Sequence, residues 1–342
     1  MKTTKINKKS LAVFSVVAGL SIICGISSVI KGISDLPQKN EQKSSERSFS
    51  QFIKNGNKFK APKNEYIAQI EITGVITDQG DTYNQEWIMD TISQLKEDKN
   101  NRGIILCIDS PGGGVYEADE TYLALMKYKK DTGRPIYSYF KNLAASGGYY
   151  IACSSDYIMA NRNSLVGSIG VICGQFVDVS EFLEKHGIRM TTIHSGRNKI
   201  MGEISEPLTK EQRDIMQSIC DEGYDQFVQI VSDARSLEKS RVIEIADGRI
   251  YTAKQAQENR LIDSTGSLED LKDAMKRREF DFADYEVVDY SYVKAENLYS
   301  MIMGAADRIG RNAMGISIFP NSAEKLLESK VKFPAYYCDL LE

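Results

Sequence analysis

The chain has 342 residues, of which 42% are hydrophobic, so it is long enough for one large domain or two small ones with an ordinary buried core. Its formal net charge is -4 and its pI is about 5.6, which argues against nucleic-acid binding because that needs a basic face. The six cysteines form no C-x-x-C pair and only His186 and His194 could add imidazole ligands, so we expect neither a structural zinc site nor a cofactor.

The N-terminal region predicts a membrane anchor. Residues 11–30 carry no charge, and about twenty helical residues match the hydrocarbon thickness of a bilayer. The lysines of residues 1–10 should stay in the cytoplasm under the positive-inside rule. We therefore expect a basic cytoplasmic tail at 1–10, a single transmembrane helix at 11–30 in the cell membrane, and the rest of the chain outside the cell. A cleavable signal peptide is the alternative, although the apolar run is long for one and no A-x-A site follows it.

The remainder divides into a linker and a folded region. Residues 31–63 are polar and mixed in charge, which is typical of a flexible stalk. We place the folded domain at 64–342. Its last part, residues 331–341, is apolar and aromatic, so we expect it to dock on its own domain or on a neighbour.

Strands and helices alternate along the folded domain. Runs of apolar or alternating residues predict strands at 66–72, 103–108, 136–140, 157–160, 171–176 and 190–194. Helical spacing and breakers predict helices around 87–95, 115–130, 147–153 and 181–186, and a long helix that begins at Thr209, with Gln212 in capping-box position, and reaches about Arg235. This alternation predicts an α/β fold with largely parallel strands.

The first candidate site is the sequence DSPGGG at residues 109–114, between a predicted buried strand and a helix. Its glycines leave backbone N–H groups uncovered, so the loop can bind an anion or a developing oxyanion. A tight strand–helix turn, capped by Asp109, is the structural alternative. The G-x-G-x-x-G spacing of a dinucleotide site is absent.

The second candidate is Ser146, which lies between small residues at a predicted strand-to-helix junction. The N-terminus of the following helix offers N–H donors and a positive dipole end. A helix N-cap is the structural alternative. A nucleophilic serine needs a base. His194 and Lys199 are both candidates, and the residues alone do not decide between them.

Together these segments resemble the S49 serine peptidase family, within it the short, single-repeat signal peptide peptidase A (protease IV) type of Gram-positive bacteria. The matching segments are DSPGG at 109–113, ASGGY at 145–149, VGSIG at 166–170, G-x-x-K at 196–199 and DGRIYT at 247–252. They occur in the family's order between residues 66 and about 271. One departure is Ile200, where a polar residue is more usual.

The resemblance implies a Clp-protease/crotonase-like fold of stacked strand–strand–helix units, preceded by the membrane helix. It makes Ser146 the nucleophile and Lys199 its general base, with Ser168 hydrogen-bonded to the lysine amine. The backbone N–H groups of Gly113 and Gly147 would form the oxyanion hole. Proteins of this type assemble as ring- or dome-shaped homo-oligomers whose subunits complete one another's active sites, so Ser146 and Lys199 need not meet within one chain.

The implied function is a membrane-anchored serine endopeptidase that degrades signal peptides or other membrane-derived peptides through an acyl-enzyme. An ordinary lysine has a pKa near 10.4, whereas a useful base needs about 7–8, and burial at a subunit interface can lower it. The alternatives are a crotonase-like acyl-CoA enzyme and a non-catalytic membrane scaffold with the same fold. We further hypothesise that residues 333–341 lie in the substrate groove and restrain activity.

Overall fold

The computed structural model describes residues 59–294. The predicted cytoplasmic tail, the membrane anchor, nearly all of the stalk and the apolar C-terminal tail lie outside these residues. Within 59–294, no helix combines the length and the hydrophobicity that crossing a membrane requires.

The chain divides into two compact units, of which residues 61–289 form the larger. The other unit joins the two ends of the chain, up to residue 60 and from residue 290 onward. In its described part, the rings of Phe59 and Tyr290 stack with centroids 5.3 Å apart.

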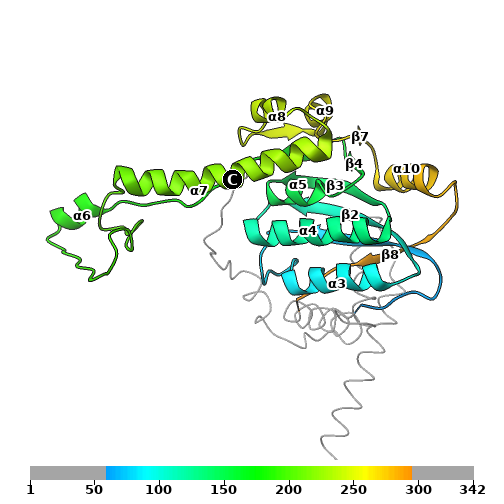
Figure 1. Cartoon of the computed structure of the whole chain (residues 1–342), viewed down its shortest axis with the longest axis horizontal. Helices are drawn as coiled ribbons and strands as arrows, with labels where there is room; N and C mark the ends of the chain where they lie inside the picture. The colour runs from blue at the N-terminus through cyan, green and yellow to red at the C-terminus, as the bar shows by residue number, and fades with distance from the viewer. Residues whose placement is uncertain (1–58, 295–342) are drawn as a thin grey trace, which may run out of the picture. The chain divides into compact units, whose positions relative to one another are not determined.

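One mixed sheet organises the described residues (Figure 1). Its strands are β1 (Tyr66–Thr73), β2 (Asn101–Ser110), β3 (Ile136–Ala145), β4 (Tyr157–Ala160), β5 (Leu165–Gly167), β6 (Ile250–Thr252), β7 (Ser264–Thr265) and β8 (Glu286–Tyr290). The order is β6-β5-β3-β2-β1-β8, with β4 branching from β3 and β7 pairing with β4. The pairs among β1 to β5 are parallel and β5–β6 is antiparallel, so the predicted α/β class with largely parallel strands is confirmed.

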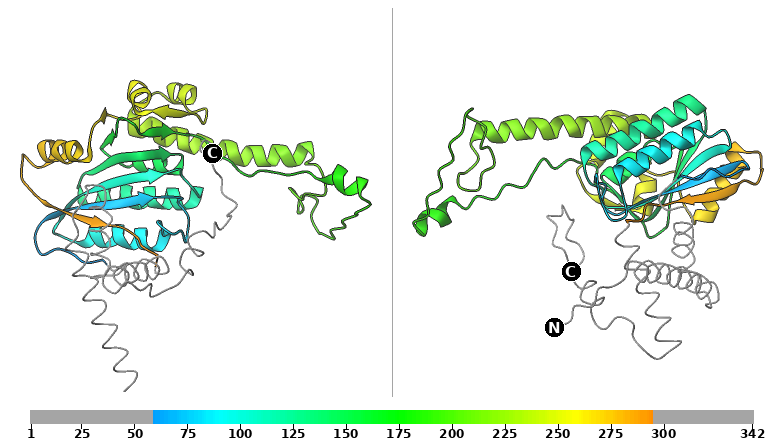
Figure 2. Two further views of the ribbon diagram at one scale, coloured as in Figure 1. Left: turned by 180° about the vertical axis from the view of Figure 1, so that it is seen from behind. Right: turned by 90° about the horizontal axis from the view of Figure 1, so that it is seen from below.

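Helices connect and cover these strands. They are α3 (Gln85–Glu97), α4 (Val115–Thr132), α5 (Gly147–Ala152), α6 (Ser180–Lys185), α7 (Lys210–Arg235), α8 (Lys239–Ile245), α9 (Ala253–Glu258) and α10 (Leu268–Glu279). Figures 1 and 2 show α3, α4 and α5 along one face of the sheet, while α10 packs on the other face through Leu271 and Met275. Because both faces are covered, Ile104–Ile108 of β2 are all fully buried, as their continuous apolar run predicts.

The strand β3 carries the candidate serine and has two partners. Its first half pairs with β4 through Tyr137–Phe140, and its second half pairs with β5 through Leu143–Ala145. The predicted strand ended at residue 140 because the polar Lys141 and Asn142 break the apolar run. The observed strand continues because the change of partner supplies hydrogen bonds as far as Ala145, directly before Ser146.

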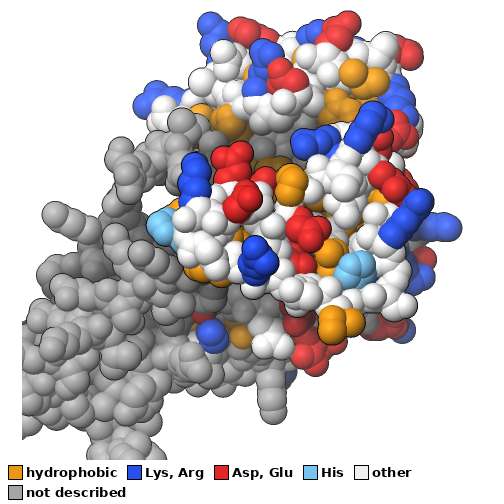
Figure 3. Space-filling view, turned by 90° about the vertical axis from the view of Figure 1, so that its left-hand side faces the viewer, with side chains coloured by type: hydrophobic (Ala, Val, Ile, Leu, Met, Phe, Trp, Pro, Cys, Tyr) orange, Lys and Arg blue, Asp and Glu red, His pale blue; other side chains and the backbone are white. Residues whose placement is uncertain are grey.

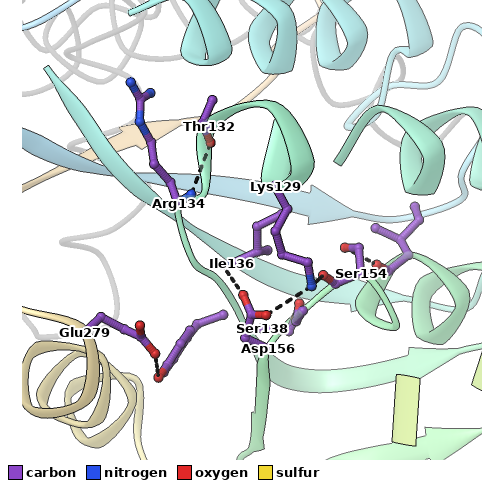
Figure 4. A network of polar contacts seen from close by, with 11 residues as sticks. Lys129, Thr132, Arg134, Ile136, Ser138, Ser154, Asp156 and Glu279 are labelled. Atoms are coloured by element: carbon purple, nitrogen blue, oxygen red, sulfur yellow. Dashed lines mark hydrogen bonds and ion pairs between the residues drawn. The ribbon is translucent and has the colours of Figure 1, made fainter. Parts of the chain in front are cut away.

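A polar network fixes the beginning of β3 (Figure 4). Lys129 at the end of α4 donates to Asp156 Oδ1 at 3.0 Å and to the Ser154 carbonyl at 2.9 Å. The other oxygen of Asp156 accepts the Ile136 N–H at 2.9 Å. Since Asp156 immediately precedes β4, this network aligns α4, β3 and β4 at the end of β3 that lies away from Ser146.

Residues 171–226, which we call the arm, extend from the sheet and include α6 and most of α7 (Figures 1 and 2). The buried residues of α7 all lie beyond the arm, at Phe227, Val228 and Val231. Figure 3 views the molecule from the side on which the arm ends, and it shows hydrophobic side chains interspersed with charges of both signs.

The arm contains both confirmed and wrong predictions. The helix predicted at 181–186 is confirmed as α6, and α7 begins after Thr209 with the predicted capping box and ends at Arg235. The strands predicted at 171–176 and 190–194 are wrong, because neither segment is a strand. A strand needs a neighbour for its backbone hydrogen bonds, and among residues 59–294 these segments meet no sheet edge.

Candidate active site

Ser146 occupies a strained turn between β3 and α5. Its φ of 51° and ψ of -120° are uncommon for a residue with a side chain, and such strain is concentrated at functional sites. Its N–H donates to the Gly167 carbonyl at 2.8 Å, which fastens the turn to the end of β5. Ser146 is the N-cap residue of α5, as the structural alternative predicts, but within the described residues its side chain makes no capping hydrogen bond. The half-buried hydroxyl is therefore left for other chemistry.

Two backbone N–H groups gather beside Ser146. Ile76 donates to the Gly112 carbonyl at 2.9 Å and accepts from the Gly114 N–H at 2.8 Å, so the intervening Gly113 N–H faces away from Ile76. The Gly113 nitrogen lies 3.4 Å from where a Cβ on Gly147 would stand. Among the described residues neither the Gly113 nor the Gly147 N–H has a hydrogen-bond acceptor. Two adjacent free donors at the N-terminus of α5 suit a developing oxyanion.

Gly112 allows the glycine loop to approach the serine. A Cβ on this residue would stand 2.7 Å from the Ser146 Cβ and 2.8 Å from the Gly147 nitrogen, and its φ is +100°. Only glycine fits at this point without displacing the serine.

The residue that holds this loop differs from the sequence prediction. Asp109 does not cap the glycine turn, because its carboxylate accepts the Leu143 N–H at 3.1 Å and thereby ties β2 to β3. Ser110 does so instead. Its hydroxyl accepts the Gly112 N–H at 3.1 Å and donates to the Gly74 carbonyl at 2.6 Å.

An open, shallow cleft lies at Ser146. Small and apolar residues from α4, α5, α7 and the segment after β5 form most of its wall. They are Gly113, Gly114, Val115, Ala118, Ser146, Gly147, Tyr150, Gly170, Val171, Gly223, Gln226 and Phe227. In the described part of the chain, no group of three or more His, Cys, Asp or Glu side chains is arranged to hold a metal ion.

The two tyrosines after the serine have different positions. Tyr149 is fully buried and donates to the Leu261 carbonyl at 2.7 Å, so it packs α5 into the core. Tyr150 reaches the cleft, donates to Asp119 at 2.6 Å and accepts from the Gln226 amide at 2.7 Å. Burial raises the pKa of Tyr150, so the phenol stays neutral and, with the Gln226 amide, supplies a fixed polar point in a largely apolar wall.

Ser168 lies on the loop that contacts the Ser146 turn. It directly follows Gly167, whose carbonyl accepts the Ser146 N–H, and its own N–H donates to the Arg249 carbonyl at 2.8 Å. Its φ is +49°. The DGRIYT segment at 247–252 supplies that carbonyl and the strand β6, so it forms a turn and a strand beside the Ser168 loop.

Lys199 lies on the arm, in the segment between α6 and α7, where it is exposed and absent from the cleft wall. Both histidines are on the arm as well. His186 contacts the Phe182 ring and His194 contacts the Gly196 carbonyl, and neither lines the cleft. The described chain therefore brings Ser146, the two glycine N–H groups and the Ser168 loop together, and it holds Lys199 apart from them.

Comparisons with known proteins identify similar peptidases. The family model described as "Peptidase family S49" matches residues 128–280. A protein of Enterococcus faecium named "Putative signal peptide peptidase SppA" is 38% identical over 234 residues, which cover 66% of this chain and 67% of that protein. "Putative protease slr0021" of Synechocystis is 36% identical over 214 residues, covering 63% of this chain and 74% of the relative.

Among solved structures, the chain is similar to a mutant of the 1510-N membrane-bound stomatin-specific protease, with a TM-score of 0.43 and 16% sequence identity. This similarity covers 67% of the present chain and 98% of the other.

Proposed function

Because the chain belongs to peptidase family S49 and is a serine peptidase, we propose that Ser146 is its nucleophile and that the Gly113 and Gly147 N–H groups form its oxyanion hole. The observation that supports this most is the strained Ser146 turn, which opens on a cleft beside two free N–H donors. The Ser146 Oγ attacks the peptide carbonyl, and the two N–H groups stabilise the tetrahedral oxyanion. Loss of the amine leaves an acyl-enzyme, which water hydrolyses.

We propose Lys199 as the general base, supplied by the arm of a neighbouring subunit. A neutral lysine amine accepts the proton of the Ser146 hydroxyl and then passes it to the departing amine, and Ser168 orients that amine. A neighbour must supply Lys199 because its own chain holds it on the arm, apart from the cleft. Enclosure between subunits also removes water from the amine, which favours its neutral form.

The apolar surface of the arm supports an assembly of identical subunits. Large hydrophobic side chains are exposed there to an extent that single chains avoid. They are Ile172, Phe176, Val177, Phe182, Ile188, Met190, Ile193, Ile204 and Ile219. Their burial against another copy would also give residues 171–176 and 190–194 the partner that their strand-like sequences lack. A ring or dome of this kind is the assembly expected for the Clp-protease/crotonase-like fold that the sequence implies.

The proposed substrates are remnant signal peptides and other membrane-derived peptides. Small and apolar cleft residues accommodate small or apolar side chains, which signal peptides contain. We further propose that residues 11–30 anchor the enzyme in the cell membrane, with the peptidase domain outside the cell. The two relatives described above are named as a peptidase and a protease, which favours neither an acyl-CoA enzyme nor a non-catalytic scaffold.

Mixed assemblies test the shared site. The full-length Ser146→Ala and Lys199→Ala variants are each expected to be inactive. When they are co-expressed with different affinity tags and purified through both, about a quarter of the sites should combine an intact serine with a neighbour's lysine and regain turnover. A mixed assembly as inactive as its components would show that lysine acts within its own chain. Failure of a serine-directed phosphonate to label Ser146 in the native enzyme would reject the nucleophile itself.

A further inference from the structure

Two cysteine thiols meet where the arm leaves the cleft. Cys173 follows the cleft segment and Cys220 lies on α7, and burial together with the adjacent Cys220 thiol raises the pKa of the Cys173 thiol. The Cys220 Sγ also contacts the Val171 carbonyl at 3.9 Å. Cys107 and Cys153 are buried in the core, but Cys173 and Cys220 are partly exposed.

The segment that contains Cys173 packs against α7. The Val171 side chain stands 3.5 Å from where a Cβ on Gly223 would be, about one helical turn beyond Cys220. Val171 and Gly223 both line the cleft. The thiol pair therefore stands at the junction between the cleft wall and the 46 residues that separate the two cysteines and include Lys199.

We propose that Cys173 and Cys220 are a redox modification site, at which a disulfide fastens the arm to α7 when the domain faces an oxidising exterior. That the domain faces an oxidising exterior is part of the proposed function, whereas the proximity of the two thiols is independent of it. The oxidant is a small-molecule disulfide. One cysteine thiolate attacks it and releases one small thiol, and the second cysteine then attacks the mixed disulfide and releases another. The two cysteines lose two electrons, and the small disulfide is reduced to two thiols.

The rate of this reaction should depend on pH. Burial raises the pKa of the Cys173 thiol to about 11, so at neutral pH little of this residue is thiolate. Since only the thiolate attacks, oxidation through Cys173 should accelerate as the pH rises toward that value.

Mass spectrometry tests the linkage directly. The full chain in detergent is treated with oxidised glutathione, free thiols are alkylated, and the protein is digested with trypsin. The peptides 163–185 and 214–235 contain Cys173 and Cys220 as their only cysteines, and we expect them to be recovered as one linked species. The double variant Cys24→Ser/Cys338→Ser should keep this species, whereas Cys173→Ser and Cys220→Ser should lose it. Alkylated Cys173 and Cys220 after oxidation, or linkage of either to another cysteine, would overturn the proposal.

Limited proteolysis supplies a second readout that is independent of turnover. After one cut by chymotrypsin between the two cysteines, oxidised protein should run as a single band without reductant and as two bands with it. Cys220→Ser should give two bands under both conditions. Two bands from the oxidised native protein without reductant would contradict the linkage. A Ser146→Ala enzyme should behave like the native one, so failure here is distinguishable from failure of the proposed catalytic site.

Discussion

At the scale of single residues, the site depends on how closely two loops approach. Ser146 can occupy its strained turn only because Gly112 leaves room beside its Cβ. The sequence shows three consecutive glycines at 112–114, and nothing in the sequence tells which of them contacts the serine. That distinction arises from the bridge between Ile76 and Gly113, which sets the direction of each peptide unit.

We predict that Gly112→Ala inactivates the enzyme. Its Cβ would stand 2.7 Å from that of Ser146, so the serine has to move, and a displacement of about 1 Å can cost about a hundredfold in rate. The unfavourable φ adds about 1–2 kcal/mol of destabilisation. Peptide turnover and phosphonate labelling measure the first effect, and thermal unfolding measures the second.

Gly133→Ala is the matched control for that variant. Gly133 caps α4 with a φ of +67°, and no atom of the described residues lies within 4 Å of the position of its Cβ. It should therefore lose similar stability and keep native turnover. Equal turnover in the two variants would show that the contact with Ser146 has no catalytic consequence.

At the scale of elements, the same capping box should have different effects in different helices. Thr209 caps α7 and Ser267 caps α10, each with a reciprocal hydrogen bond from the third helical residue. Removing such a cap costs about 1 kcal/mol. The capped end of α7 lies in the arm, whereas α10 buries Leu271, Ala274 and Met275 in the main core.

We therefore predict local fraying for Thr209→Ala and a global loss of stability for Ser267→Ala. Amide exchange over residues 210–218 should become about fivefold faster in Thr209→Ala, while the midpoint of thermal unfolding stays unchanged. Ser267→Ala should lower that midpoint. Hydrogen exchange with mass spectrometry and calorimetry distinguish the two, and a lowered midpoint in Thr209→Ala would contradict this division between arm and core.

The strands that the sequence predicts correctly are those whose partners belong to the same compact unit. The helix α3 and the strands β1, β2 and β4 follow from local periodicity because a neighbour within 61–289 covers their apolar residues. The two wrong strands carry equally apolar runs on the arm, where Ile193 is 96% exposed. Periodicity reports which residues require a partner, but it does not report whether that partner lies in the same chain.

The candidate site likewise contains residues that the sequence indicates and residues that it does not. The sequence indicates Ser146 and the glycine loop because small residues at a strand–helix junction have few structural uses. The contributions of Ser110, Gly167 and Tyr150 depend on contacts between segments distant in sequence, and no local pattern reveals them. Lys199 was identified only through the resemblance to a family, since an exposed lysine on a loop resembles any other.

At the scale of the whole molecule, the proposed enzyme requires an arm whose apolar side chains are exposed in the single subunit and buried in the assembly. We predict that Ile193→Asp prevents assembly without unfolding the subunit. Substitution of an exposed residue should change the free energy of unfolding by less than about 0.5 kcal/mol, whereas a charge placed in a packed interface should lower turnover by about tenfold or more. Sedimentation of the full chain in detergent, thermal unfolding and peptide turnover measure the three quantities.

Ile243→Asp provides the comparison for that prediction. Ile243 is 49% exposed on α8, which is outside the arm, so its replacement should leave assembly and turnover unchanged. If both variants dissociated the enzyme, the arm would have no special part in assembly. If Ile193→Asp sedimented and turned over substrate as the native enzyme does, this part of the arm would not be buried between subunits. The route that we propose for Lys199 to a neighbour's Ser146 would then need a different surface.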